Sequence, residues 1–255
     1  MGNRWLDAFR LDDRVVVITG ASSGLGAGFA RALAACGGTL VLAARREDRL
    51  TALATELAAD GTDVLAQRTD VSDPEDCTAL VAAAVERFGR VDVLVNNAGV
   101  GEALPASRQT PEMFRAVLDV NLTGLYAMAR ACAPAMPAGS SIVNVASVHG
   151  LVASRVPQAA YAASKAGVIG LTRDLAQQWS RRKGIRVNAL CPGYFASEMT
   201  AGVDESVREL VEQHSILGRL GEQPELDTAL LFLASAASSY VTGTTLAVDG
   251  GYSAI

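Results

Sequence analysis

A tyrosine and a lysine lie four positions apart in the stretch Tyr161-Ala-Ala-Ser-Lys165, which is otherwise rich in alanine. If the stretch is helical, the two side chains lie one turn apart on the same face. A free phenol has a pKa of about 10, so at neutral pH only about one such group in a thousand is ionised. A neighbouring ammonium group favours the phenolate and would allow the pair to transfer protons. The spacing leaves open a second interpretation, in which Tyr161 is a half-buried packing residue.

A glycine-rich stretch, Thr19-Gly-Ala-Ser-Ser-Gly-Leu-Gly26, directly follows an apolar run near the start of the chain. Its G-x-x-x-G-x-G spacing is looser than the dinucleotide fingerprint G-x-G-x-x-G. Glycines let the backbone approach a pyrophosphate, and the N–H groups that open the next helix bind the anion. No Gly-Lys-Ser/Thr follows, which excludes a P-loop. The alternative is an ordinary strand-to-helix turn, but the place between the first strand and the first helix favours dinucleotide binding.

The next apolar run ends in two arginines, Arg45 and Arg46, with no acidic residue before Glu47. In a dinucleotide-binding fold a carboxylate at this strand end bonds the adenosine ribose, whereas arginine accommodates a 2′-phosphate. A guanidinium matches a phosphate with paired hydrogen bonds. The sequence therefore favours NADP(H) as cofactor, with NAD(H) possible. The alternative is that both arginines only solvate the end of a strand.

Short β-branched runs alternate with longer, Ala- and Leu-rich helical patterns along the whole chain. The expected strands are Val15–Thr19, Thr39–Ala43, Asp63–Gln67, Val91–Val95, Ser141–Ala146, Ile185–Leu190 and Thr244–Val248. Most are apolar throughout, as in strands covered on both faces. Stretches such as Glu47–Ala59, Pro74–Phe88 and Met113–Ala133 are long enough to be helices. The alternation predicts an α/β fold with a single Rossmann-type, doubly wound parallel sheet of about seven strands and helices on both faces.

No low-complexity linker divides the chain, so residues 1–255 are expected to form a single dinucleotide-binding catalytic domain. One segment, residues 194–220, departs from the alternating pattern because it mixes glycines with a charged stretch. It follows the end of a strand, where ligands bind in this type of fold. We therefore expect it to form a lid over a substrate site.

The composition argues against several classes of protein. The chain has 22 Lys and Arg and 27 Asp and Glu, a net charge of −5, and no basic run longer than Arg181-Arg182-Lys183, which argues against a nucleic-acid surface. Its four cysteines form no C-x-x-C pair and it has two histidines, so no metal site is expected. The N-terminus lacks the apolar core of a signal peptide, and no apolar run reaches the about 20 residues that span a membrane. The expectation is a soluble, cytoplasmic protein.

From Val15 to about Gly251 the chain resembles the short-chain dehydrogenase/reductase family, whose motifs it carries in the family's order. After the glycine-rich loop these motifs are Asp70-Val, Asn96-Asn-Ala-Gly99, Asn121, Ser147, Tyr161-Ala-Ala-Ser-Lys165, Cys191-Pro-Gly193 and Val248-Asp-Gly-Gly251. Any one of them is a weak signal, but eight in register are a strong one. The resemblance implies an NAD(P)-dependent oxidoreductase that interconverts a ketone and a secondary alcohol.

The same resemblance implies which residues contact the cofactor. They are Gly20, Ser22, Ser23, Gly24, Leu25, Gly26, Arg45, Arg46, Asp70, Val71, Asn97, Ala98, Gly99, Tyr161, Lys165, Pro192, Gly193, Phe195 and Ser197. Ser197 stands where the family usually has threonine, a change that keeps the hydroxyl group. Ser23 occupies a place where some NADP(H)-using members carry a basic residue, and this departure weakens the NADP(H) prediction.

Four residues would carry the chemistry. Tyr161 is expected to be the acid and base at the reacting oxygen, and Ser147 to donate a second hydrogen bond to that oxygen. By the resemblance Lys165 would bond the nicotinamide ribose and lower the pKa of Tyr161, and Asn121 would hold a water beside Lys165. The alternatives are that Ser147 is a turn residue and that Asn121 only distorts or caps a helix.

The substrate is less well defined by the sequence. His149, Tyr194 and Met199 are expected to line its pocket, although His149 would also fit a solvated loop. The chain resembles bacterial 3-oxoacyl-carrier-protein reductases and gluconate 5-dehydrogenases, which implies an acyl thioester or a small sugar acid as substrate. Family members are commonly homotetramers, so a homotetramer is expected. A cofactor-binding regulator or scaffold without turnover is the alternative function, and the intact Ser147, Tyr161 and Lys165 argue against it.

Overall fold

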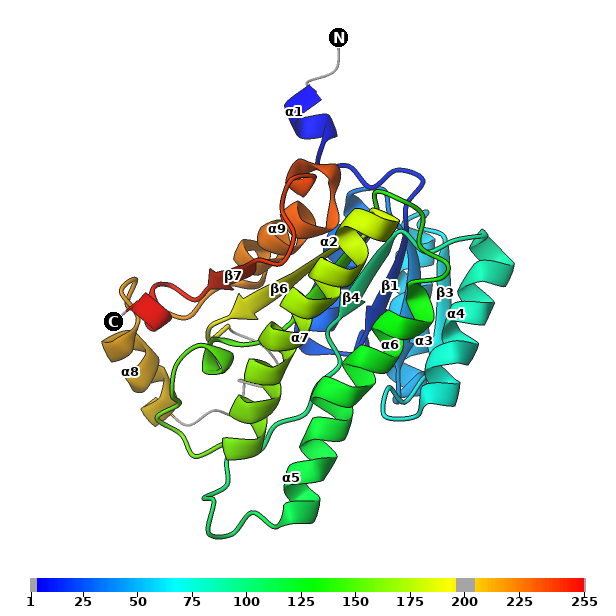
Figure 1. The fold of residues 1–255 in the computed structure, drawn as a ribbon. Helices are drawn as coiled ribbons and strands as arrows, with labels where there is room; N and C mark the ends of the chain where they lie inside the picture. Colours follow the sequence, from blue (N-terminus) through cyan, green and yellow to red (C-terminus); the bar gives the residue numbers. More distant parts are fainter. Residues whose placement is uncertain (1–3, 196–204, 255) are drawn as a thin grey trace.

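The structure is a computed structural model that describes residues 4–195 and 205–254. Within these residues, seven parallel strands form one sheet in the order β3-β2-β1-β4-β5-β6-β7 (Figure 1). The strands are β1 (Val15–Thr19), β2 (Thr39–Ala44), β3 (Val64–Arg68), β4 (Val93–Asn96), β5 (Ser141–Val145), β6 (Arg186–Pro192) and β7 (Thr245–Val248). The predicted doubly wound parallel sheet is confirmed, and each predicted strand end lies within two residues of the observed one.

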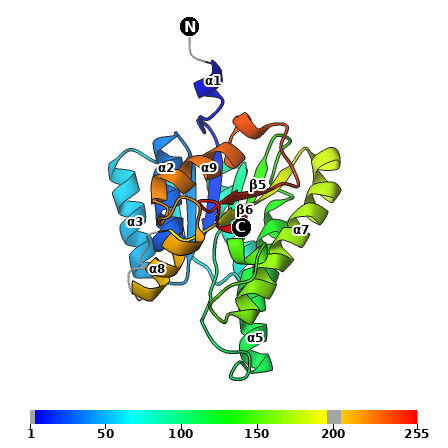
Figure 2. The ribbon, with the colours of Figure 1, turned by 90° about the vertical axis from the view of Figure 1, so that its left-hand side faces the viewer.

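Alternate strand residues point to opposite faces of the sheet and pack against two separate groups of helices. Val16 and Ile18 face the first group, and Val15 and Val17 face the second. The first group contains α2 (Gly24–Ala35), α3 (Glu47–Ala59) and α9 (Gln223–Ala234), and the second contains α4 (Pro74–Phe88), α6 (Leu125–Cys132) and α7 (Ala159–Lys183). Figure 2 shows α2, α3 and α9 on one side of the sheet and α7 on the other. Strands β1 and β5 are buried along their whole length because both faces are covered.

Local sequence signals set several helix ends. The side chain of Asp73 accepts a hydrogen bond from Glu75 N at 2.9 Å, and Pro74 opens α4. Helix α7 ends at Gly184, whose φ of +70° is the left-handed conformation that glycine adopts readily. The remaining described elements are α1 (Arg4–Asp7), α5 (Pro111–Leu118), α8 (Glu205–His214) and short 3₁₀ turns at Val148–Gly150, Ala236–Ser238 and Tyr252–Ala254. None of the helices in the described ranges is long and apolar enough to cross a membrane.

The helix expected over Met113–Ala133 is not regular, so that prediction is wrong in detail. Helices α5 and α6 are joined by a π-helical turn at Asp119–Gly124. The side chain of Asn121 accepts a hydrogen bond from Val100 N and donates one to Val100 O, both at 2.8 Å. These tertiary bonds hold the wide turn open, which is a common feature of functional sites in helices.

The strand order reverses between β1 and β4. From β1 the chain continues to β2 and β3 on one side, whereas β4 leads to β5, β6 and β7 on the other. The loops that leave the carboxyl ends of β1 and β4 therefore diverge, and a crevice forms between them. This is the place where doubly wound sheets bind their ligands.

Candidate active site

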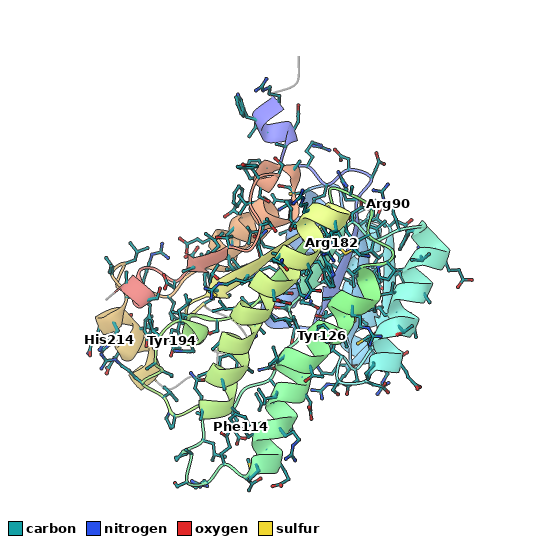
Figure 3. The ribbon with its side chains drawn as sticks, in the orientation of Figure 1. Arg90, Phe114, Tyr126, Arg182, Tyr194 and His214 are labelled. Carbon is teal, nitrogen blue, oxygen red and sulfur yellow. The ribbon has the colours of Figure 1, made fainter. Side chains whose placement is uncertain are left out.

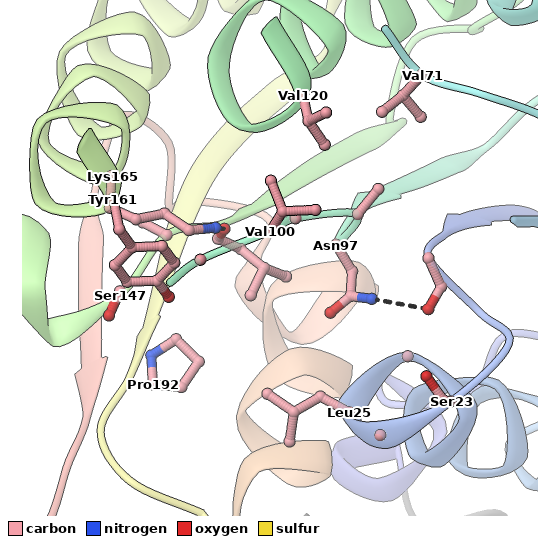
Figure 4. Close-up of a pocket in the computed structure, with 18 of the residues that line it drawn as sticks. Ser23, Leu25, Val71, Asn97, Val100, Val120, Ser147, Tyr161, Lys165 and Pro192 are labelled. Carbon is pink, nitrogen blue, oxygen red and sulfur yellow. Dashed lines mark hydrogen bonds between the residues drawn. The ribbon is translucent and has the colours of Figure 1, made fainter. Parts of the chain in front are cut away.

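A cavity of about 720 Å³ lies at the carboxyl ends of the strands, on both sides of the point where the strand order reverses. Figure 4 shows Ser147, Tyr161 and Lys165 on one side of it and Ser23 and Leu25 on the other. Its wall contains these predicted cofactor residues: Gly20, Ser22, Ser23, Gly24, Leu25, Gly26, Arg45, Arg46, Asp70, Val71, Asn97, Ala98, Gly99, Tyr161, Lys165, Pro192, Gly193 and Phe195. Residues far apart in the sequence thus share one wall. Ser197 and Met199 lie outside the described residues.

Sequence reasoning missed part of this wall. The additional lining residues are Ala44, Thr69, Val100, Gly101, Glu102, Ala103, Val120, Val145, Ala146, Val156 and Gln158. Several of them directly adjoin a predicted position, as Val100 follows Gly99 and Ala146 precedes Ser147. The signal that could have found them is the strand-end position itself, because the loops that leave the carboxyl ends of β1 to β6 border the cavity.

The glycine-rich loop packs tightly against the end of β4. Gly20 has a φ of +68°, and a Cβ placed on it would lie 2.8 Å from Ala98 Cα. A Cβ on Gly26 would lie only 2.3 Å from Gly20 O. The Nδ2 atom of Asn97 donates to Gly20 O at 3.3 Å and fastens the loop from the β4 side (Figure 4). Larger residues at Gly20 and Gly26 would push the loop away from the sheet.

The cavity side of this loop suits a pyrophosphate. Nothing lies within 4 Å of a Cβ placed on Gly24, so the loop faces open space at that point. Helix α2 begins there, without an acidic residue in its first turn and without a capping hydrogen bond from the Ser23 side chain. The first N–H groups of α2 are thus left for an anion, which the positive end of the helix dipole also attracts. The loop fits the dinucleotide that the sequence predicts.

Two arginines line the cavity beyond the loop. The Arg46 guanidinium donates to Ser22 Oγ at 3.2 and 3.3 Å and also to Ser23 Oγ. A hydrogen bond from Ser72 lowers the pKa of Asp70, and the Arg45 charge contributes further. Arginine, serine hydroxyl groups and an ionised aspartate thus lie around one end of the cavity. Guanidinium and hydroxyl donors are a suitable set for a phosphate group.

At the opposite end the structure brings Ser147, Tyr161 and Lys165 together. Ser147 follows β5 and is buried, and it shares a side-chain hydrogen bond with Tyr161. Tyr161 and Lys165 lie on α7, where the predicted one-turn spacing places Lys165 Nζ 5.6 Å from the centre of the Tyr161 ring. Lys165 Nζ donates to Val145 O at 2.8 Å, so the end of β5 holds both the serine and the lysine.

In the protein without ligand, burial is the largest cause of the pKa shifts of Tyr161 and Lys165. It raises the pKa of Tyr161, and the hydrogen bond from Ser147 offsets part of that rise. It also lowers the pKa of Lys165 to about 8. A lowered pKa of Tyr161, which the sequence predicts, is therefore not a property of these two side chains alone. Such a lowering requires Lys165 to stay charged close to the phenol.

Asn121 lies behind the cavity wall and does not line it. Besides its two bonds to Val100, its Nδ2 atom donates to Ser164 Oγ at 3.0 Å. A Cβ placed on Gly99 would lie 3.4 Å from Asn121 Oδ1 and 3.6 Å from Lys165 Nζ, so both side chains approach the same backbone position. Asn121 thus shapes the π-helical turn, as its alternative interpretation suggests, and it also lies near the lysine.

His149 is buried with 8% of its surface exposed, so the solvated-loop alternative for this residue is wrong. Its ring lines the cavity, and its Nε2 atom lies 3.0 Å from Tyr194 Oη. Figure 3 marks Tyr194, which lines the cavity from the residues after β6. The ring centres of His149 and Tyr252 are 6.1 Å apart, and those of Tyr194 and Tyr252 are 5.5 Å apart. Sequence reasoning missed Tyr252, although it directly follows the Asp-Gly-Gly motif.

A family model places the chain among known proteins. The model described as enoyl-(acyl carrier protein) reductase matches residues 20–253. Fold, cavity and this match agree on a class of dinucleotide-dependent enzymes with one Rossmann-type sheet. The chain belongs to the short-chain dehydrogenase/reductase family, as the sequence predicts, and is an NAD(P)-dependent oxidoreductase.

Several relatives match over nearly their whole length. The chain is 45% identical over 253 residues to galactitol 2-dehydrogenase (L-tagatose-forming) of Cereibacter sphaeroides, which covers 96% of each chain. It is 38% identical over 244 residues to a 3-oxoacyl-[acyl-carrier-protein] reductase of Thermotoga maritima, covering 95% of this chain and 98% of the relative. One relative is longer: the chain spans 44% of an uncharacterized short-chain type dehydrogenase/reductase of Sinorhizobium fredii, at 40% identity.

Solved structures show the same fold. A gluconate 5-dehydrogenase from Burkholderia cenocepacia in complex with NADP and tartrate superimposes with a TM-score of 0.92. The two chains are 36% identical, and the match covers 98% of this chain and 99% of the other. The NADP in that crystal structure belongs to a protein that shares this fold over almost its full length.

Proposed function

We propose that this protein interconverts a ketone and a secondary alcohol with NADP(H) as the preferred cofactor. The observation that carries the proposal is that one cavity has Ser147, Tyr161 and Lys165 in the wall at one end and Arg45 and Arg46 at the other. A dinucleotide needs donors for its phosphates at one point and a proton donor near the reacting carbon at another. Both kinds of group lie in this one wall.

Different residues would bind different parts of the cofactor. Gly20, Gly24 and Gly26 would hold the pyrophosphate against the start of α2, and the arginines would hold the 2′-phosphate. The bound nicotinamide supplies the hydride that reduces the carbonyl carbon, or accepts it in the reverse direction. Pro192 and Gly193, after β6, line the same cavity and would support that end of the cofactor.

The proton is handled by the residues of β5 and α7. Tyr161 would give its phenolic proton to the carbonyl oxygen, and Ser147 would stabilise the developing negative charge with a second hydrogen bond. Lys165, charged below its pKa of about 8, would favour the phenolate that remains. A water between Lys165 and Asn121, which approach the same backbone position at Gly99, would return a proton from solvent.

The proposal also covers the substrate class, the lid over the substrate and the oligomeric state. Two substrate classes are retained, a 3-oxoacyl thioester and a sugar acid, which the names of the Thermotoga and Burkholderia relatives support respectively. Residues 194–220, of which 196–204 lie outside the described residues, would form the lid; near its end Leu217 N donates to Gly250 O at 3.0 Å beside the C-terminal motif. A homotetramer would cover the α5–α6 side, where Met113 is 38% and Tyr126 is 44% exposed. Tyr126 is labelled in Figure 3.

The direct test is a panel of ketones and secondary alcohols with all four nicotinamide cofactors, followed at the absorbance of the reduced nicotinamide. We expect turnover of at least one carbonyl compound, with a higher kcat/KM for NADPH than for NADH. Silence across a broad panel would contradict the enzymatic function. A clear preference for NADH would contradict the cofactor assignment alone.

A double substitution of the two arginines tests which cofactor the protein prefers. Replacing both Arg45 and Arg46 by alanine is expected to raise the KM for NADPH by about 10- to 100-fold and to leave the KM for NADH within about threefold. The reason is that hydrogen bonds to charged groups contribute about 1.5–3 kcal/mol, and NADH has no 2′-phosphate to lose them. Arg87→Ala is the matched control, because this arginine pairs with Asp63 and is absent from the cavity wall. Equal losses for both cofactors would contradict the assignment.

Gly101 gives a second prediction, about the position of the tyrosine. A Cβ on Gly101 would lie 2.8 Å from Tyr161 Cδ2, closer than carbon atoms pack, so Gly101→Ala must displace the ring. We expect kcat to fall by about 10- to 100-fold, because small displacements of a reacting group cost this much. Gly170→Ala on α7, the helix that carries Tyr161, is the control, since nothing lies within 4 Å of its added Cβ. Steady-state kinetics of both variants checks this, and an unchanged kcat in Gly101→Ala would contradict it.

A further inference from the structure

The substrate end of the cavity contains a buried polar atom without a partner. Among the described residues that line the cavity, His149 Nδ1 is a buried side-chain nitrogen that makes no hydrogen bond. The other ring nitrogen, Nε2, is paired with Tyr194 Oη at 3.0 Å. Buried polar atoms are nearly always hydrogen-bonded, so an unpaired one on a residue that lines a ligand cavity points to a missing partner.

The ring is fixed close to the groups that hold the reacting oxygen. His149 lies two residues after Ser147, and its backbone N donates a hydrogen bond to Ser147 Oγ at 3.2 Å. This bond holds the backbone of the histidine close to the serine. The edge-on contacts with Tyr194 and Tyr252, at 5.5 and 6.1 Å between ring centres, restrict the rotation of the imidazole. A polar substrate group near the reacting carbon would therefore meet a preorganised partner.

The protonation of the cluster suits a neutral polar group. Burial lowers the pKa of His149, so the ring is neutral at neutral pH and one of its nitrogens is a donor and the other an acceptor. Burial raises the pKa of Tyr194, and the neighbouring Tyr252 raises it further, so the Tyr194 hydroxyl keeps its proton. In either tautomer of His149, a hydroxyl group can pair with Nδ1, because a hydroxyl both donates and accepts.

We propose that His149 Nδ1 recognises a second hydroxyl group of the substrate, on a carbon one or two bonds from the reacting carbon, and that the substrate is therefore a polyhydroxylated ketone or alcohol. This inference rests on the proposed function and decides between its two substrate classes. Gln158 lines the same wall and donates to Ser154 Oγ at 2.7 Å, and with Tyr194 it adds further polar groups to this end. Such groups match hydroxylated carbons better than the hydrocarbon chain of an acyl thioester.

The test compares three small ketones with NADPH: 3-hydroxy-2-butanone, 2-butanone and ethyl acetoacetate. The first carries the second hydroxyl, the second lacks it, and the third represents a 3-oxoacyl group. We expect kcat/KM for the hydroxyketone to exceed that for 2-butanone by about tenfold or more, because without the hydroxyl a buried nitrogen stays unpaired. A preference for ethyl acetoacetate would overturn the inference but not the ketone reduction, whereas no turnover of any ketone by either reduced cofactor would overturn both.

Variants of His149 separate recognition from structure. The amide of asparagine lies near the position of Nδ1 and that of glutamine near the position of Nε2. We expect His149→Gln to bring the ratio of the two specificity constants, hydroxyketone over 2-butanone, close to one, and His149→Asn to retain most of it. The ratio is measured within each variant, so a loss common to both ketones cancels. An unchanged ratio in His149→Gln, or equal ratios in both variants, would overturn the assignment and leave His149 a packing residue.

Discussion

Tyr161→Phe is expected to lower kcat by about 1000-fold or more and to leave the dissociation constant of NADPH within about twofold. General acid catalysis contributes about 10²- to 10⁴-fold, and phenylalanine keeps the ring while removing the hydroxyl. Burial raises the pKa of Tyr161 in the protein alone, so the phenol carries its proton at neutral pH and can donate it during carbonyl reduction. Steady-state kinetics and a fluorescence titration with NADPH measure the two quantities.

The matched control is Tyr240→Phe, the same chemical change at a fully exposed tyrosine outside the cavity wall. It should leave kcat within experimental error. Retention of wild-type turnover by Tyr161→Phe would reject the acid–base role. A large loss of NADPH affinity in the same variant would instead mean that the ring mainly shapes the cofactor pocket, and the loss of turnover would then say little about proton transfer.

The strands and most of the cavity could be predicted because their signals are local. A strand covered on both faces is a nearly continuous apolar run, as residues 15–18 of β1 are, so it is visible in the sequence. In a parallel sheet all carboxyl strand ends meet at one edge, so the order of the motifs predicts that Gly20, Asn97 and Ser147 face one cavity. The structure places all three there.

The features that sequence reasoning missed depend on contacts between distant parts of the chain. The π-helical turn around Asn121 exists because that side chain bonds the backbone of Val100, 21 residues earlier. Tyr252 joins His149 across the cavity edge from a C-terminal turn. Neither contact has a local pattern, because nothing near Asn121 or Tyr252 in the sequence specifies its partner. The burial of His149 follows from the same tertiary contacts.

The sequence also could not give the sign of the pKa shifts. The four-residue spacing correctly places Lys165 beside Tyr161, but the balance between charge attraction and dehydration depends on burial. In the folded protein dehydration prevails for both groups. A buried lysine that retains its charge lowers stability, and its presence here suggests a function that compensates for this cost.

Lys165→Met tests that conflict between stability and activity. A pKa displaced from 10.5 to about 8 corresponds to about 3 kcal/mol of unfavourable folding free energy at neutral pH. The variant removes this cost but also the charge-assisted bond to Val145 O, worth about 1.5–3 kcal/mol. We therefore expect the midpoint of thermal unfolding without cofactor to rise by about 1–6 °C at pH 7. At the same time kcat should fall by about 100-fold or more, because the phenolate loses its positive partner.

The stability difference between Lys165→Met and the unmodified protein should also depend on pH. Below pH 8 the lysine is protonated in the folded and unfolded chains, so the full cost is present. Between pH 8 and 10.5 the folded protein loses the proton first, and the unmodified protein gains stability relative to the variant. The advantage of Lys165→Met should therefore shrink towards pH 10, whereas Lys183→Met, at the exposed end of the same helix, should show no such trend. An advantage that is absent at pH 7, or constant with pH, would mean that Lys165 is not held charged against dehydration.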